Sequence, residues 1–126
     1  MLIAVDFDGT IVMHQYPRVG PPIEGAIEWM KKWSEAGAKL ILWTMRDKEQ
    51  LDDAIKYCED NGVLFYSYNR NPMQSSWTTS PKCYAHVYVD DAAFGCPLIK
   101  ETGSSPYVNW SIVGPSVLSM IEEFYQ

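Results

Sequence analysis

Three short apolar runs in this sequence are each followed at once by side chains that can do chemistry. The runs are LIAV, LILW and VYV, and the side chains that follow them are those of Asp6 and Asp8, of Thr44 and Arg46, and of Asp90 and Asp91. The carboxyl ends of the strands in an open parallel sheet share one edge, where ligands bind. If the three runs are such strands, we expect four carboxylates, a hydroxyl and a guanidinium in one crevice.

Carboxylates gathered in this way raise each other's pKa, so the cluster costs stability unless a cation lies among them. Oxygen ligands without histidine or cysteine suit a hard ion, and Mg²⁺ is the leading candidate. Bound Mg²⁺ usually bridges to a phosphate, and a carboxylate beside it can attack phosphorus to form an aspartyl-phosphate, while a second acid moves the proton. The transferred phosphoryl group also needs a positive donor, and Lys82, just ahead of VYVDD, is placed to supply one.

The same positions have ordinary structural explanations. An Asp-Gly pair between apolar residues is a strong hairpin signal, so DFDGT taken alone could be a simple turn. The Asp90–Asp91 pair can cap a helix, Lys82 can be a surface lysine, and Arg46 can lie at a solvated helix start. None of these explanations accounts for three apolar runs that end in the same kind of chemistry.

The elements that must position these residues alternate between strands and helices. Continuous apolar runs are typical of strands covered on both faces, and helical spacing with Pro and Gly at the ends indicates amphipathic helices. The pattern predicts strands at 2–5, 38–44, 63–68, 86–89 and 107–112, helices at 21–37, 47–62 and 115–126, a helical turn at 82–86, and a polar loop at 69–81. This alternation predicts an α/β fold around a parallel sheet.

Length and composition predict a single domain, residues 1–126, in a reducing compartment. The net charge of −6 lacks the basic surface of a nucleic-acid binder and the polybasic helix of a membrane-surface protein. The three cysteines form no C-x-x-C pair, and their odd number does not suggest a disulfide framework. Asp6 interrupts the first apolar run, and no run approaches the roughly 20 residues that span a bilayer. We therefore expect a cytoplasmic protein.

The motifs DFDGT, LWTMR, SPK and VYVDD, in this order over residues 6–91, resemble those of the haloacid dehalogenase (HAD) superfamily of phosphatases and phosphotransferases. The resemblance implies a Rossmann-like three-layer α/β/α sandwich. It also implies an enzyme that is a Mg²⁺-dependent phosphatase, a phosphoric monoester hydrolase working through an aspartyl-phosphate.

The resemblance further implies a role for each motif residue. Asp6 would be the nucleophile and a Mg²⁺ ligand, and Asp8 the general acid/base, with its backbone carbonyl on the metal. Thr44 would hydrogen-bond the phosphoryl group and Lys82 would neutralise it. Arg46 is a candidate substrate contact from its place after the second apolar run, not from the resemblance, and a solvated helix start is the alternative that we favour for it. Asp90 would be the second metal carboxylate, with Asp91 supporting it.

The chain departs from most of this superfamily because it has no room for a cap domain. The interval 11–22 is long enough only for a flap hairpin, and 69–81 only for a loop. An open site suits a bulky phosphorylated substrate as well as a small one, or a site completed by a neighbouring subunit of a homo-oligomer. Trp77 in the second interval either packs that loop down or forms a substrate wall or subunit contact.

Two other function classes compete with an enzyme. A receiver-like signalling domain is also small, binds Mg²⁺ and is phosphorylated on aspartate, but its acceptor should follow a middle strand, and LFYSYN ends without an acid. A non-catalytic interaction module could keep the fold, although all the motif residues are intact.

Overall fold

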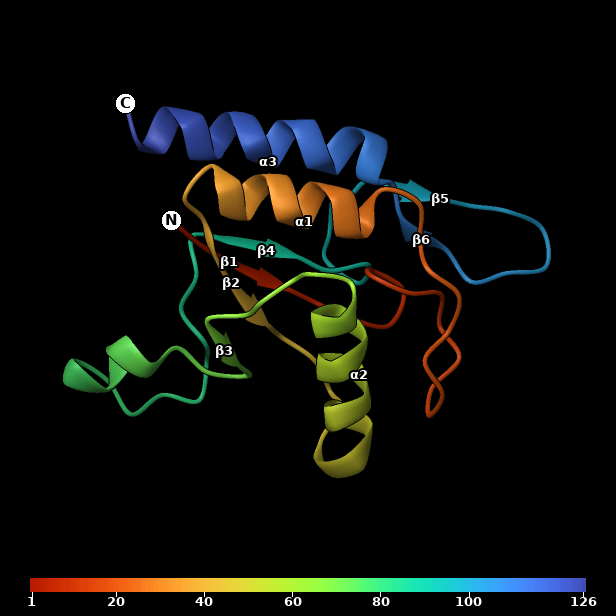
Figure 1. Cartoon of the computed structure of the whole chain (residues 1–126), viewed down its shortest axis with the longest axis horizontal. Helices are drawn as coiled ribbons and strands as arrows, with labels where there is room; N and C mark the ends of the chain where they lie inside the picture. Colours follow the sequence, from red (N-terminus) through yellow and green to blue (C-terminus); the bar gives the residue numbers. More distant parts are fainter.

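The structure, a computed structural model, describes residues 1–126 and has an α/β architecture (Figure 1). Strands and helices alternate as the sequence predicts, and no cap domain interrupts them. In chain order the elements are β1 (Leu2–Val5), α1 (Ala26–Glu35), β2 (Lys39–Leu42), α2 (Lys48–Asp60), β3 (Ser67–Tyr68), the 3₁₀ helix η1 (Pro72–Ser76), β4 (Val87–Val89), β5 (Leu98–Ile99), β6 (Tyr107–Val108) and α3 (Trp110–Phe124).

The central sheet has four parallel strands in the order β3-β2-β1-β4, which confirms the predicted Rossmann-like fold class. Helices α1 and α3 cover one face of this sheet and α2 lies on the other (Figure 1). Val5 of β1 is in register with Leu42 of β2 and with Val89 of β4. The residues that follow these three strands therefore emerge level with one another at one edge of the sheet.

Two buried tryptophans join the helical layer to the loop that follows β1. Trp33 of α1 and Trp110 of α3 have ring centroids 5.1 Å apart. The indole N–H of Trp33 donates to the carbonyl of Gly114 at 3.0 Å, and that of Trp110 donates to the carbonyl of Thr10 at 2.7 Å. A fully buried large side chain contributes about 1.5–3 kcal/mol by removal from water, so these rings are major contributors to the stability of this layer.

The C-terminal helix begins earlier than predicted, and the strand expected at 107–112 is wrong beyond Val108. The side chain of Asn109 accepts a hydrogen bond from Ser111 N and so caps α3, which then starts at Trp110. Pro115 lies inside this helix rather than at its start. Strand β6 pairs antiparallel with β5 in a small separate sheet.

The segment between β3 and β4 also differs from the prediction. The third strand is only two residues long, the loop contains η1, and the helical turn expected at 82–86 does not form. The side chain of Gln74 takes the place of that turn, because it donates to the carbonyls of Ser80 and Lys82 and accepts from Tyr84 N at 2.8 Å. These bonds satisfy backbone groups that a helical turn would otherwise pair.

The first helix begins at Ala26, five residues after the predicted start, because Gly25 precedes it in a left-handed conformation with φ of 89°. The two chain ends lie side by side (Figure 1). The N-terminal amine donates to the Tyr125 hydroxyl, which donates in turn to the carbonyl of Gly37 at 2.9 Å. None of the helices is both long and apolar enough to cross a membrane.

Candidate functional site

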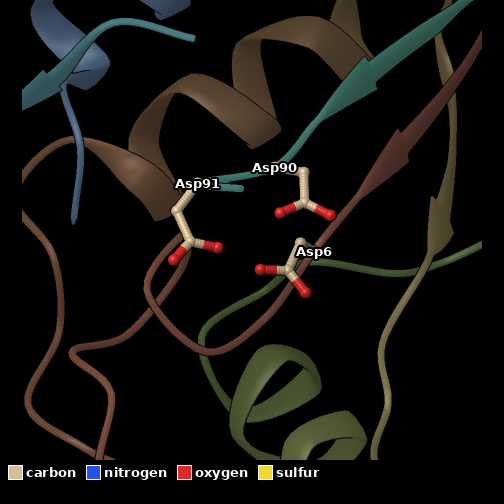
Figure 2. A group of neighbouring side chains, drawn as sticks. All are labelled: Asp6, Asp90 and Asp91. Carbon is tan, nitrogen blue, oxygen red and sulfur yellow. The ribbon is translucent and has the colours of Figure 1, made fainter. Parts of the chain in front are cut away.

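Three carboxylates converge at the carboxyl edge of the sheet, as Figure 2 shows. Asp6 follows β1, and Asp90 and Asp91 follow β4. One oxygen from each lies within 4.8 Å of the others, so the group could hold a metal ion. Asp90 was predicted as a ligand and Asp91 only as its support, and the structure brings both to Asp6.

The Gly9–Thr10 pair in DFDGT sets the spacing of these carboxylates. The buried hydroxyl of Thr10 donates to Asp6 Oδ2 at 2.9 Å and accepts from Asp91 N at 3.1 Å, so it bridges the two strand ends. Gly9 has φ of 83°, and a Cβ there would lie 2.4 Å from Asp91 Oδ2. Position 9 therefore requires glycine for two reasons: the backbone has a positive φ, and a side chain would enter the space that the Asp91 carboxylate fills. Sequence reasoning missed Thr10, although its place directly after Asp-Gly was the available signal.

The electrostatics of the cluster favour a bound cation. Burial, followed by the charge of Asp90, raises the pKa of Asp6 from 3.8 to about 8. Burial also raises the pKa of Asp91. Carboxylates crowded in this way ionise at a cost, which a positive ion among them would offset. The donor set is all oxygen, so the residues present fit a hard divalent ion.

Asp8 does not join this cluster, because a buried ion pair holds it. Arg46 Nε and Nη2 donate to Asp8 Oδ2 and Oδ1, both at 2.8 Å. The other guanidinium N–H groups donate to the carbonyls of Pro17, Arg18 and Gln50. Arg46 is only 1% exposed, so the solvated helix start weighed for it is wrong. These five hydrogen bonds occupy all five N–H groups of the guanidinium, and none is left to donate to a substrate.

Thr44 lies at the end of the β2 segment, with its backbone fixed by a residue that the sequence analysis missed. Asn69, directly after β3, accepts from Thr44 N at 2.7 Å through Oδ1. The Thr44 hydroxyl accepts from Arg46 N at 3.1 Å, which leaves its own hydrogen free to donate. Asn69 has φ of 55°, and an asparagine that tolerates this conformation just after a strand was the available signal.

A cavity of about 550 Å³ opens over these side chains. Most of the predicted site residues line it, and the flap adds two more. The lining residues are Asp6, Asp8, Thr44, Arg46, Asp90 and Asp91, with His14 and Tyr16 from the flap and Met45 and Ala92 at the rim. An adjoining hollow of about 330 Å³ adds Trp43 and Asn69.

Lys82 is the predicted site residue that the structure does not bring to this cavity. Its side chain is exposed and makes no hydrogen bond or ion pair, while its backbone is held by Gln74 and Ser80. Trp77 also lies apart from the cavity lining, with its ring edge-to-face against Tyr84 at 6.0 Å. The Trp77 side chain stays 61% exposed beside this contact, so both explanations for Trp77 stay predictions.

Comparisons with known proteins give one structural relative. No protein-family model matches the chain, and no curated protein matches it. The chain is similar to a solved structure described as a conserved protein of Bacteroides thetaiotaomicron, with 37% sequence identity and a TM-score of 0.76. The match covers 95% of this chain and 91% of that one.

Proposed function

This chain belongs to the family of that conserved Bacteroides thetaiotaomicron protein. From the residues of the site we propose that it is a Mg²⁺-dependent phosphatase of the HAD type. The observation that carries the proposal is the convergence of Asp6, Asp90 and Asp91 in a cavity that Asp8 also lines. The order of the motifs DFDGT, LWTMR, SPK and VYVDD supports it.

Asp6, Asp90 and Asp91 would hold the metal ion, with the Asp8 backbone carbonyl as a further ligand. A bound Mg²⁺ would neutralise the carboxylates and polarise the phosphoryl oxygens of the substrate. The closeness of the three side-chain oxygens, the partial burial of all three acids and the raised pKa of Asp6 support this assignment.

The chemistry divides between the two acids of DFDGT. An Asp6 oxygen attacks phosphorus, so that a bond to Asp6 forms while the bond to the leaving oxygen breaks. Asp8 gives a proton to that leaving oxygen. Water then attacks the aspartyl-phosphate and passes a proton to Asp8, the Asp6–phosphorus bond breaks, and inorganic phosphate leaves.

The phosphoryl group needs donors, and Thr44 supplies the first. Its hydroxyl hydrogen is free, and its backbone is fixed by Asn69. Lys82 remains the predicted neutralising cation, and this role requires its exposed side chain to swing towards the cavity when substrate binds. The absence of a cap leaves the cavity open to bulky as well as small phosphate monoesters, and the sharing of the site between subunits stays a prediction.

Hydrolysis of a generic aryl phosphate in the presence of Mg²⁺ tests this function. Asp6→Asn should abolish turnover while circular dichroism shows an intact fold, because the amide cannot form the aspartyl-phosphate. Asp52→Asn is the matched control, since Asp52 is an exposed acid of α2 outside the cavity. Wild-type turnover in Asp6→Asn would show that the mechanism is wrong.

A receiver-like domain has less support. Strand β3 ends at Tyr68 and is followed by Asn69 rather than by an aspartate. A stable phosphoprotein without turnover would favour that class, and no reaction across a broad phosphate panel would favour a non-catalytic module.

A further inference from the structure

The guanidinium of Arg46 joins the first turn of α2 to two neighbouring segments after β1, which are the loop at Asp8 and the flap. Its fork holds Asp8 from the loop after β1, and Nη1 donates to the carbonyl of Gln50 in α2 at 3.2 Å. The remaining bonds go to the flap, which we define as residues 11–22. No other buried cation lies near the cavity.

The flap is anchored at its base and held at its tip by Arg46. At the base, Met13 N donates to the carbonyl of Pro21 at 2.8 Å. At the tip, the carbonyls of Pro17 and Arg18 accept from the guanidinium at 3.2 and 2.7 Å, and the Tyr16 ring lies 5.2 Å from its carbon. The tip side chains are otherwise exposed, so these contacts are its main tie to the body of the protein.

We propose that Arg46 is a positioning residue that links the flap to Asp8 and fixes the orientation of the Asp8 carboxylate. The link itself rests only on the contacts above. The role of the held carboxylate rests on the proposed phosphatase function.

The two bonds from the guanidinium set the direction of the Asp8 carboxylate. Both carboxylate oxygens accept hydrogen bonds from Arg46, at 2.8 Å each, so the side chain is held at two points. The second half of the reaction, in which water attacks the aspartyl-phosphate and loses a proton, needs a carboxylate held in one place. A lysine in place of Arg46 keeps the charge but cannot hold both oxygens and both flap carbonyls at once.

Pre-steady-state hydrolysis of 4-nitrophenyl phosphate separates this role from a general loss of structure. Its leaving group departs without a proton, so the first half of the reaction does not need Asp8. In Arg46→Lys we expect a burst of about one nitrophenol per site, followed by a steady rate about 100-fold below wild type, the lower end of what general base catalysis contributes. Equal loss of the burst and the steady rate would overturn the positioning role.

Arg18→Lys is the matched control, because Arg18 is an exposed arginine of the same flap whose side chain makes no hydrogen bond. It should keep the wild-type time course. If Arg46→Lys does not fold, Tyr16→Ala removes the ring over the guanidinium from a side chain that is 52% exposed. We then expect the same burst with a smaller loss of steady rate, and an unchanged time course would count against the proposal.

Hydrogen exchange tests the link without any turnover. Asp8→Asn should speed amide exchange across the flap although Asp8 lies outside it, because the Asn side chain cannot accept both bonds of the fork. Arg46→Lys should do the same, and Arg18→Lys should not. Unchanged flap exchange in Asp8→Asn would overturn the link. A wild type without phosphatase turnover would instead overturn the proposed function and the base role, with the exchange result still deciding the link.

Discussion

Replacing Asp6 with asparagine should stabilise the protein in the absence of divalent metal while it removes activity. Asp6 is partly buried beside Asp90 and Asp91, and its pKa is raised to about 8. Asparagine has nearly the same shape and can still accept the hydrogen bond from Thr10. The substitution therefore removes the free-energy cost of placing an acid with a raised pKa at this position, and it disturbs little else.

The size of the gain follows from the two pKa values. In the unfolded chain Asp6 ionises at its ordinary pKa of 3.8, whereas in the folded protein it holds its proton up to about pH 8. At pH 7, about three pH units above the ordinary value, this difference lowers the free energy of unfolding by about 4 kcal/mol, at about 1.4 kcal/mol per pH unit. That is a large share of the roughly 5–15 kcal/mol by which domains are stable.

The sign of the pH dependence is set by which state binds more protons. Between pH 4 and 8 the folded state holds a proton on Asp6 that the unfolded state has lost, so the contribution of Asp6 to stability is greatest below pH 4 and is lost as the pH rises to 8. Urea unfolding in EDTA, followed by tryptophan fluorescence at several pH values, measures this slope. Asp6→Asn should flatten this slope, and its free energy of unfolding should exceed that of wild type most clearly near pH 8.

Two results would refute this reasoning. One is a difference in stability between Asp6→Asn and wild type, measured in EDTA, that does not grow between pH 4 and 8. The other is an Asp6→Asn variant that is no more stable than wild type at pH 8, which would mean that the cluster ionises without the expected cost. Asp52→Asn serves again as the control. Because Asp52 is an exposed acid, its replacement should change the free energy of unfolding by no more than about 0.5 kcal/mol and should leave the pH dependence unchanged.

Three further predictions concern the same cluster. Mg²⁺ should raise the melting temperature of wild type more than that of Asp90→Ala, because the variant lacks one ligand; a larger rise in the variant would contradict the metal assignment. Gly9→Ala should lower stability by about 1–3 kcal/mol and weaken Mg²⁺ binding measured by calorimetry, because its Cβ would meet Asp91 at 2.4 Å. Thr10→Val should cost about 1–3 kcal/mol in urea unfolding through two lost hydrogen bonds, and an unchanged midpoint would deny Thr10 its bridging role.

The sequence predicts the parallel sheet and the acids at its edge because both depend on local patterns. An apolar run that is buried on both faces indicates a parallel strand, and the residue after it must emerge at the sheet edge. Asp6, Thr44 and Asp90 are positioned by this rule alone, and the structure places all three in one cavity.

The remaining site contacts depend on pairings between distant residues. Arg46 meets Asp8 across 38 positions, and Thr10 meets Asp91 across 81. No local pattern distinguishes a buried arginine with five hydrogen bonds to four residues from one at a solvated helix start. Lys82 shows the opposite problem. Its place in the motif order predicts a role at the site, while a hydrogen bond from Gln74 fixes its backbone where the lysine side chain is exposed.

Element boundaries were missed where a side chain or a glycine overrides the pattern. Asn109 caps α3 and so starts the helix within a stretch rich in strand-forming residues. Gly25 delays α1 beyond the prolines that ordinarily mark a helix start. In each case one backbone conformation or one capping bond decided the boundary.

The meeting of the chain ends has a consequence for engineering this protein. The N-terminal amine and Tyr125 lie in contact at the amino end of β1, and the carboxylate cluster lies at its carboxyl end (Figure 1). A short linker could therefore join the two ends and the chain could be reopened in an exposed loop, since circular permutation is tolerated where termini are close and at the surface. The loop at 101–106, exposed and remote in sequence from every cavity acid, is the natural place for the new ends.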